Sequence, residues 1–210
     1  ENQLAADRMR YFETMYSAAG GAAGGAAGGS GQVIDGPIKN CTVQALDGND
    51  NVIAQTTTNT LGKYTFPTVV PEGSTIKAFG GTDAITNLAY TGTLFGNSTF
   101  TKTISPISTF TELLRKERSI TFEAALTNVI ASSSVFFEVE LSDANKDIYL
   151  NQDYVEKALN GDDTALAAYT VGTFLEGSTE MICVFIKKCI HFCSLSIYSL
   201  ISYKVCCYVF

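Results

Sequence analysis

The chain has 210 residues, of which 46% are hydrophobic, and a formal net charge of −7. The first 180 residues hold 11 of the 14 basic side chains and all 21 acidic ones, a net charge of −10. A surface this acidic repels phosphate backbones, which argues against nucleic acid as a partner. No pattern of an export signal follows Glu1, so we expect the chain to be an internal piece of a longer protein.

Two contrasting segments open the chain. Residues 1–17 space their apolar side chains loosely as one face of a helix does, which predicts a helix that ends a preceding domain. An ordinary surface helix or an unstructured start is the alternative. Residues 18–31 (AAGGAAGGAAGGSG) have no charge and no bulky side chain, so they cannot bury enough surface to offset their chain entropy. We predict a flexible linker there.

Short β segments separated by turn residues fill residues 32–104. Glycine, proline, asparagine and aspartate mark the turns, and β-branched or aromatic residues are enriched between them. Regularly spaced turns of this kind predict a Greek-key β-sandwich of about seven strands. The predicted strands are Gln32–Asp35, Cys41–Leu46, Val52–Thr56, Lys63–Phe66, Thr75–Phe79, Leu88–Phe95 and Phe100–Ile104.

A small helical unit is predicted to follow over residues 105–180. Its first helix places Phe110, Leu113 and Leu114 on one face, and Ser119 is the expected start of its second. The predicted fold class is therefore α+β, a sandwich followed by a helical unit and preceded by the N-terminal helix and Gly/Ala linker. The predicted helices cover residues 107–118, 121–131, 153–159 and 164–175.

The last 30 residues, 181–210, differ in composition from the rest. They hold five of the six cysteines and no glycine, proline, alanine or acidic residue. Lys187 and Lys188 interrupt the apolar run, and Cys189–Tyr203 offers 15 residues where a membrane-spanning helix needs about 20. Two interpretations stay open: a gene-model artefact, or a membrane anchor or buried hydrophobic hairpin.

The start of the predicted sandwich carries a set of motifs. The segment Gln32–Ile38 (QVIDGPI) precedes Cys41-Thr42-Val43, the polar turn Asp47–Asn51 and the hairpin Thr57–Phe66 (TTNTLGKYTF). These motifs resemble carboxypeptidase regulatory-like domains, which have a transthyretin-like or Cna-B-like sandwich. The resemblance implies a β-sandwich and supports no particular activity.

Each matched residue has a mechanical role in the expected sandwich. Gly36 and the proline after it turn the chain, and Gly62 relaxes the hairpin loop. Tyr64 and Phe66 alternate with polar neighbours and so face the core. Cys41 stands where the family has a small apolar residue, and we expect it to be a buried core thiol.

The resemblance extends to about residues 31–176. Residues 80–94, the segment Ser105–Thr109 (SPIST) and residues 153–165 are similar to repeats in large bacterial and marine surface proteins. In those repeats a sandwich is followed by an SPLTTL segment that opens a helix. The resemblance thus implies an extracellular or cell-surface setting.

Few residues suit catalysis or a metal centre. The only histidine, His191, lies in the doubtful tail, so a serine or cysteine nucleophile elsewhere has no histidine to activate it. The tail cysteines match no zinc-ligand spacing, and the glycine tract lacks the lysine of a phosphate-binding loop. Acidic residues are abundant, but abundance alone does not make a glycosidase pair. The chain is predicted to be no enzyme, with no catalytic residue, metal or cofactor.

The most chemically suggestive segment is residues 143–153 (DANKDIYLNQD). Its oxygen-bearing side chains at alternate positions resemble a calcium loop. Ile148 stands where such a loop needs glycine, and Tyr154 stands where a carboxylate is expected. The alternative is a plain polar loop ahead of a helix, with Asp153 near the helix start. The candidate ligands are Asp143, Asn145, Asp147, Asn151 and Asp153.

Two weaker candidates lie in the sandwich. The turn at residues 47–51 has the oxygens to hold a cation, although a hairpin connection is the simpler interpretation. Asn40 and Asn97 each begin a glycosylation sequon, which matters only in a eukaryotic secretory pathway.

Three functions remain. The leading hypothesis is a non-catalytic structural or adhesive module of an exported multidomain surface protein, with an unidentified protein or polysaccharide partner. The second is an accessory carbohydrate- or peptide-binding domain attached to an enzyme. That domain needs a line of exposed aromatic residues, for which Tyr90, Phe95 and Phe100 are the candidates. The third is a tail-anchored membrane protein, which requires residues 181–210 to be a real anchor.

Overall fold

The structure is a computed structural model that describes residues 29–137 and 141–177. The chain divides into two compact units, Glu1–Phe174 and Leu175–Phe210. All elements below belong to the first unit, apart from the end of the last helix. The expected segments that lie outside the described residues are the helix over 1–17, most of the linker over 18–31 and the tail 181–210.

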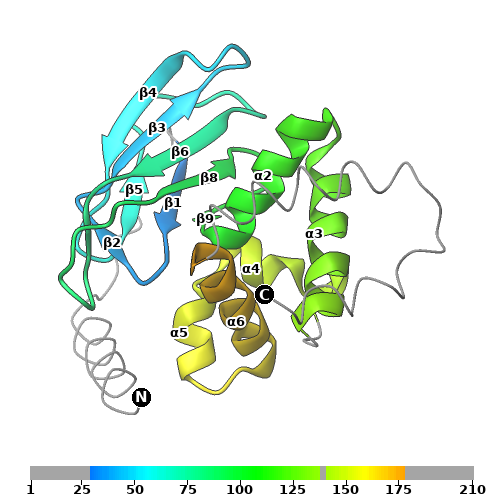
Figure 1. Ribbon diagram of the computed structural model, residues 1–210. Coiled ribbons are helices and arrows are strands. Elements are labelled where there is room, and N and C mark those ends of the chain that lie inside the picture. Colours follow the sequence, from blue (N-terminus) through cyan, green and yellow to red (C-terminus); the bar gives the residue numbers. More distant parts are fainter. Residues whose placement is uncertain (1–28, 138–140, 178–210) are drawn as a thin grey trace. The chain divides into compact units, whose positions relative to one another are not determined.

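The described residues form nine strands in three sheets and five α-helices, an α+β architecture (Figure 1). The strands are β1 (Ser30–Val33), β2 (Ile38–Lys39), β3 (Thr42–Leu46), β4 (Val52–Thr57), β5 (Lys63–Thr65), β6 (Thr75–Phe79), β7 (Thr82–Asp83), β8 (Thr93–Asn97) and β9 (Thr103–Ile104). One sheet has the order β4-β3-β6-β8, with every neighbouring pair antiparallel. In the second sheet β1 lies between β5 and β9, antiparallel to β5 and parallel to β9. Strands β2 and β7 form the third.

The two larger sheets share one hydrophobic core. Tyr64 on β5 is buried between exposed Lys63 and Thr65, and Phe66 beyond the strand is buried too, which confirms the expected alternation. The two aromatic rings meet edge to face, with centroids 5.5 Å apart. The buried cluster consists of Val33, Ile38, Cys41, Val43, Ala45, Tyr64, Phe66, Ile76, Ala78, Leu94 and Ile104.

All seven predicted strands overlap an observed strand, and the differences lie at short elements. Strands β2 and β7 were not expected, because two residues show no periodicity, and they pair with each other. The prediction of a strand from Leu88 onward is wrong: the chain there is irregular until Thr93. A turn precedes this segment: the Asp83 carboxylate accepts hydrogen bonds from the backbone of Ile85 and Thr86, and the Asp83 N–H donates to the carbonyl of Leu88 over 3.0 Å. Ser30 begins β1, so the linker ends earlier than predicted.

Two turns hold the conformations that their residues predict. Asp47 accepts hydrogen bonds from the backbone N–H groups of Asn49 and Asn51 at 2.8 Å each, which closes the β3–β4 hairpin. Gly62 has φ +72°, and a Cβ there would lie 2.7 Å from the carbonyl oxygen of Val33. Only glycine fits this position without strain, as its proposed role in the hairpin required.

The helices follow the sheets in the chain. Three of the four predicted helices coincide with α2, α5 and α6, and the second is α3, which runs further than expected. Helix α4 and the 3₁₀ turn were not predicted. The elements are α2 (Pro106–Arg118), α3 (Phe122–Phe137), η1 (Asp143–Asn145), α4 (Lys146–Asn151), α5 (Tyr154–Leu159) and α6 (Asp163–Gly177).

Capping residues define the first two helices. Ser105 caps α2 through a capping box with Ser108, and Pro106 occupies the first turn, so the SPIST segment opens a helix as expected. The prediction that Ser119 starts the next helix is wrong, because Ser119 ends α2 in the left-handed region, with φ 50°. The hydroxyl of Thr121 instead accepts the backbone N–H of Ala124 at the start of α3.

In the part of the chain that the structure describes, no helix has the length and apolar character needed to span a bilayer.

Candidate functional site

A buried carboxylate joins α2 to the four-stranded sheet. Glu112 has no exposed surface. Thr75 of β6 donates its hydroxyl hydrogen to Glu112 Oε1 over 2.7 Å. Arg115, one turn later on α2, donates Nε to Oε2 over 2.8 Å and Nη2 to Oε1 over 2.7 Å. These bonds offset the cost of burying the carboxylate. We call Thr75, Glu112 and Arg115 the α2 clamp.

A hollow of about 500 Å³ opens beside the α2 clamp. Its lining includes Asp47 and Asp50 from the β3–β4 turn, together with Arg115 and Lys116 from α2. Lys116 Nζ lies 2.6 Å from Asp50 Oδ1, and this ion pair connects α2 to the β3–β4 hairpin. That pair is exposed and contributes little to stability.

Each charged group around the hollow already has a partner. The side-chain hydrogen bond from Asn51, followed by the backbone N–H groups of Asn51 and Asn49, lowers the pKa of Asp47. The hydrogen bond to Glu112 raises the pKa of Arg115. Glu112 is closed to solvent, and the hydrogen bond from Thr75 connects it to β6. The arrangement therefore acts as a mechanical link between sheet and helix.

The polar face of α2, and not the predicted apolar one, meets the edge strand β8. Thr109 Oγ1 accepts the backbone N–H of Phe95 over 2.8 Å, and Ser108 donates to the carbonyl of Phe95 over 2.6 Å. The predicted apolar face is confirmed at Phe110 and Leu114, and a different, polar face meets β8 because an edge strand needs hydrogen-bonding partners. Phe110 and Leu114 pack instead in a second apolar cluster, with residues of α3.

The candidate calcium segment is helical. Residues 143–145 form η1 and residues 146–151 form α4, so neither the calcium loop nor the plain polar loop is present. The carboxylate of Asp147 accepts hydrogen bonds from Asn151 over 2.8 Å and from Gln152 over 2.5 Å. These two bonds, that from Asn151 first, lower the pKa of Asp147. Asp153 caps α5 by accepting the backbone N–H of Glu156 over 3.0 Å, as the second interpretation expected.

Apolar residues within the segment explain its conformation. Tyr149 has no exposed surface and Leu150 is 5% exposed. A calcium loop turns alternate oxygens inward, whereas α4 turns these two side chains inward. The polar residues instead serve the sheet: Asn151 Oδ1 accepts the backbone N–H of Lys102 over 3.2 Å. Gln32 Nε2 donates to Asp153 over 2.9 Å, which ties β1 to α5.

The aromatic candidates form no exposed line. None of the three is fully exposed. Tyr90 packs against the sandwich core, and Phe100 stacks on Phe122 of α3 with ring centroids 5.0 Å apart. Phe95 lies on β8, whose backbone meets α2. The platform expected of a sugar-binding domain is therefore not built from these residues.

Cys41 and the two sequons differ in exposure. The Cys41 side chain is fully buried in the hydrophobic core that the sheets share, which confirms the predicted core thiol. Asn40 is exposed in a turn with φ 55°. Asn97 is 3% exposed and accepts the backbone N–H of Thr99, so its sequon is closed in the folded chain.

The turn at residues 47–51, the other cation candidate within the described residues, forms no metal centre either. Among residues 29–137 and 141–177, no three or more His, Cys, Asp or Glu side chains gather in a geometry that could hold a metal ion. His191 and the five tail cysteines lie outside these residues.

Sequence reasoning missed the α2 clamp. The pattern of residues 107–118 predicted an apolar helix face and no role for Glu112. The available signal was the spacing of Ser105, Ser108 and Glu112, which places three polar groups along one helix stripe. Thr75 carried no signal, because its partner lies 37 positions away.

Comparisons with protein-family models, with curated proteins and with solved structures give no match for this chain.

Proposed function

We propose that this chain is a non-catalytic structural or adhesive module of an exported multidomain surface protein. The observation that carries the proposal is the α2 clamp, which fastens the helices to the four-stranded sheet through a fully buried carboxylate. A module that bears load or presents a surface needs its parts to move together. The clamp supplies such a link, because separating helix from sheet breaks the hydrogen bond that Thr75 donates to the buried carboxylate of Glu112.

Further links of the same kind support the proposal. Ser108 and Thr109 bind the backbone of Phe95, and the hydroxyl of Thr103 donates to the carbonyl of Gln152 over 3.0 Å. These contacts attach both α2 and the α4–α5 connection to strands. The helical unit is thus joined to the sandwich at several independent points.

The fold proposed for the sheets is a Greek-key sandwich of the carboxypeptidase regulatory-like kind. The shared core between the four-stranded and three-stranded sheets supports it. Three residues of the matched motif also support it: Tyr64 and Phe66 are buried, and Gly62 has a positive φ. This assignment concerns architecture, and the surface role rests on the separate argument above.

Surface labelling of intact source cells tests the proposed setting. Cells treated with a membrane-impermeant biotin reagent should yield biotinylated protein that bears this module, detected with an antibody against it. A cytosolic protein of similar abundance serves as the control and should remain unlabelled. Labelling that requires permeabilised cells would contradict the proposal.

A further inference from the structure

The outer sides of the edge strands β8 and β9 are covered. On β8, the hydroxyls of Ser108 and Thr109 occupy the backbone groups of Phe95. Beside β9, the backbone N–H of Lys102 donates to the carbonyl of Leu150 over 2.9 Å. Covering an edge in this way prevents it from pairing with another chain.

Strand β5 is protected in a different manner. It has three residues and carries an exposed lysine, Lys63. Short length and an edge lysine both disfavour strand addition. Strands β2 and β7 have two residues each, which is too few to pair with another chain.

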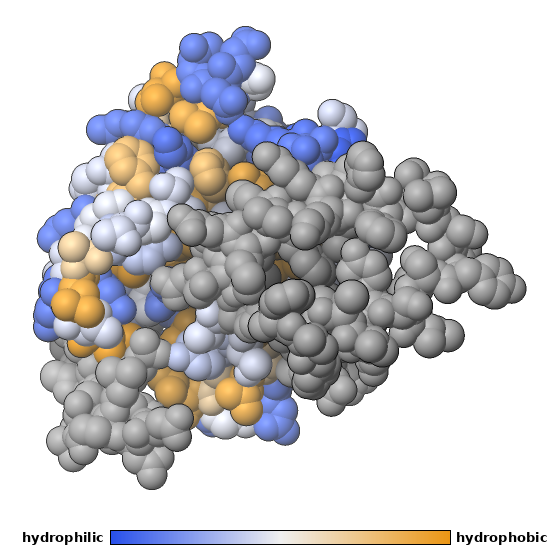
Figure 2. Space-filling view, in the orientation of Figure 1, coloured by the Kyte–Doolittle hydropathy of each residue, from blue (hydrophilic) through white to orange (hydrophobic). Residues whose placement is uncertain are grey.

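Strand β4 has none of these protections among the described residues. It is the longest strand of the structure described, with six residues (VIAQTT), and it has no charge and no proline. The side chains of Val52 and Ile53 are 52% and 41% exposed. Figure 2 shows hydrophobic surface over this part of the molecule, next to the hydrophilic surface of the β3–β4 turn. A bulge lies at Ile53, which has no partner in the register between Ala45 and Leu46, and residues 54–57 are regular.

The hydrogen-bond pattern shows which backbone groups of β4 face outward. The N–H of Thr58 donates to Cys41 and its carbonyl accepts from Asn40, so Thr58 faces the β3 side. Bonding alternates along an antiparallel pair, so Thr56 also faces β3, whereas Gln55 and Thr57 direct their N–H and C=O groups away from the sheet. Strand β4 thus offers a donor and an acceptor at every second residue.

We infer that β4 pairs antiparallel with β4 of a second copy of this chain and joins two four-stranded sheets into one of eight strands. A two-fold axis near Gln55 makes each outward N–H meet an outward C=O of the partner strand. The pairing also brings Gln55 of one copy opposite Gln55 of the other. The inference does not depend on the proposed surface role.

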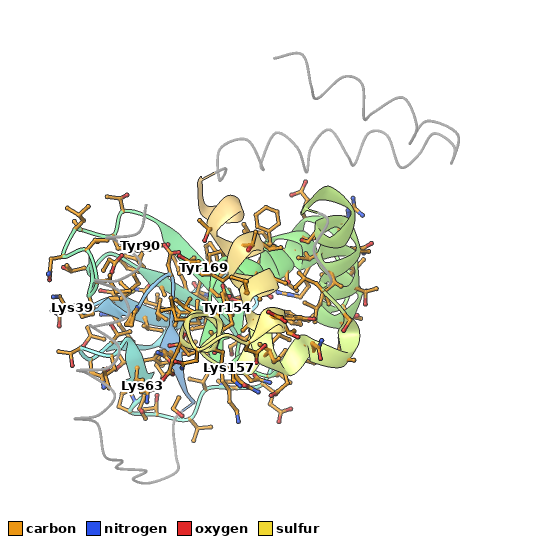
Figure 3. The ribbon with its side chains drawn as sticks, turned by 90° about the horizontal axis from the view of Figure 1, so that it is seen from below. Lys39, Lys63, Tyr90, Tyr154, Lys157 and Tyr169 are labelled. Carbon is orange, nitrogen blue, oxygen red and sulfur yellow. The ribbon has the colours of Figure 1, made fainter. Side chains whose placement is uncertain are left out.

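Charge complementarity favours a second copy as the occupant. The Val52 end of β4 lies at the acidic turn that carries Asp47. The Thr57 end lies near Lys39 and Lys63, because Asn40 donates to Thr58, and Asn59 donates to Lys63 over 2.8 Å. Figure 3 shows both lysines on the strand side of the molecule. Antiparallel pairing places the acidic end of each copy beside the basic end of the other, which favours association.

Sedimentation of the full chain under reducing conditions, from micromolar to millimolar concentration, tests the inference. The wild type should shift from monomer to dimer. Ile53→Lys should raise the dissociation constant about tenfold or more, because it places a charge on the shared edge. Leu88→Lys is the matched control, since Leu88 is 69% exposed and lies outside β4, and it should dimerise as the wild type does.

Gln55→Pro provides a second variant. It removes an outward N–H and keeps the backbone hydrogen bonds to β3, with the loss of one exposed side-chain bond that Gln44 Nε2 donates to Gln55 Oε1 over 2.8 Å. It should therefore abolish dimer formation and leave the far-UV circular dichroism spectrum unchanged. A wild type that stays monomeric throughout overturns the inference. So does a dimer that persists in Ile53→Lys and Gln55→Pro, or one that Leu88→Lys weakens equally. If Gln55→Pro fails to fold, the comparison of the two lysine variants decides.

Discussion

At the scale of single residues, Glu112 and Cys41 are two buried ionisable groups with contrasting surroundings. Thr75 and Arg115 supply hydrogen bonds to the Glu112 carboxylate in the interior. Cys41 lies among apolar side chains, and burial raises the pKa of its thiol to about 11. Hydrogen-bond donors thus surround one group, and apolar side chains surround the other.

Glu112→Ala should lower the free energy of unfolding by about 3 kcal/mol, because it leaves Arg115 without its partner beside the sheet. Glu117→Ala, an exposed position on the same helix, is the matched control and should change stability by less than about 0.5 kcal/mol. Urea denaturation followed by circular dichroism measures both. Equal effects of the two substitutions would mean that the α2 clamp has no special role.

Cys41 gives a prediction for alkaline pH. The folded chain holds the thiol proton more tightly than the unfolded chain, whose value is near 9.0. The resulting stability is complete below pH 9 and is lost as the pH rises through about 11. Burial raises the pKa of Tyr64 as well, which acts in the same direction above pH 10. Cys41→Ala should therefore flatten, but not remove, the decline in melting temperature. An unchanged slope between pH 9 and pH 11 would contradict the assignment.

At the scale of elements, close backbone packing restricts β1. A Cβ added at Gly31 would lie 2.4 Å from the carbonyl oxygen of Lys102 and 2.7 Å from the hydroxyl of Tyr64. Gly48, in the β3–β4 turn, has nothing within 4 Å of such a Cβ. The two glycines thus differ in packing, which allows a matched comparison.

Gly31→Ala should destabilise the protein by about 2 kcal/mol or more, because backbone atoms must move to admit the methyl group. Gly48→Ala should be within about 0.5 kcal/mol of the wild type. Thermal unfolding of both variants under the same conditions measures the difference. A loss at Gly48 as large as that at Gly31 would show that packing around β1 is not the cause.

The helical segment at residues 143–151 leads to a prediction about calcium. Since Asn151 and Gln152 occupy the Asp147 carboxylate, millimolar calcium should leave the melting temperature unchanged. Asp147→Ala should show the same absence of response. A rise of several degrees in the wild type, lost in Asp147→Ala, would restore the calcium hypothesis.

Local patterns predicted the elements whose signals lie within one stretch of sequence. Alternation around Tyr64 and the serine–proline start of α2 identified a strand and a helix correctly. Strand β2 was missed because its two residues are held by a partner far along the chain. Helix α4 was not predicted because the oxygen-bearing residues around Tyr149 suggested a loop, although Tyr149 is buried. The partners of Glu112 could not be predicted because they depend on how α2 packs on the sheet.

At the scale of the whole described unit, the links between sheets and helices imply cooperative unfolding. Amides in the centre of β3 and in the middle of α2 should exchange with solvent hydrogen at similar opening free energies. Hydrogen exchange measured residue by residue tests this. Much faster exchange in α2 than in β3 would mean that the helices open while the sandwich stays folded.

The parallel pairing of β1 with β9 has a consequence for biosynthesis. Gln32 pairs with Thr103, so β1, the first of the described strands to leave the ribosome, has to wait for β9, the last of them. Strand β3 can form its hairpin with β4 early, but β1 keeps one side open until residue 104 has emerged. A nascent chain stalled before that point carries an incomplete sheet, and chaperones that bind exposed strands should associate with it most strongly there.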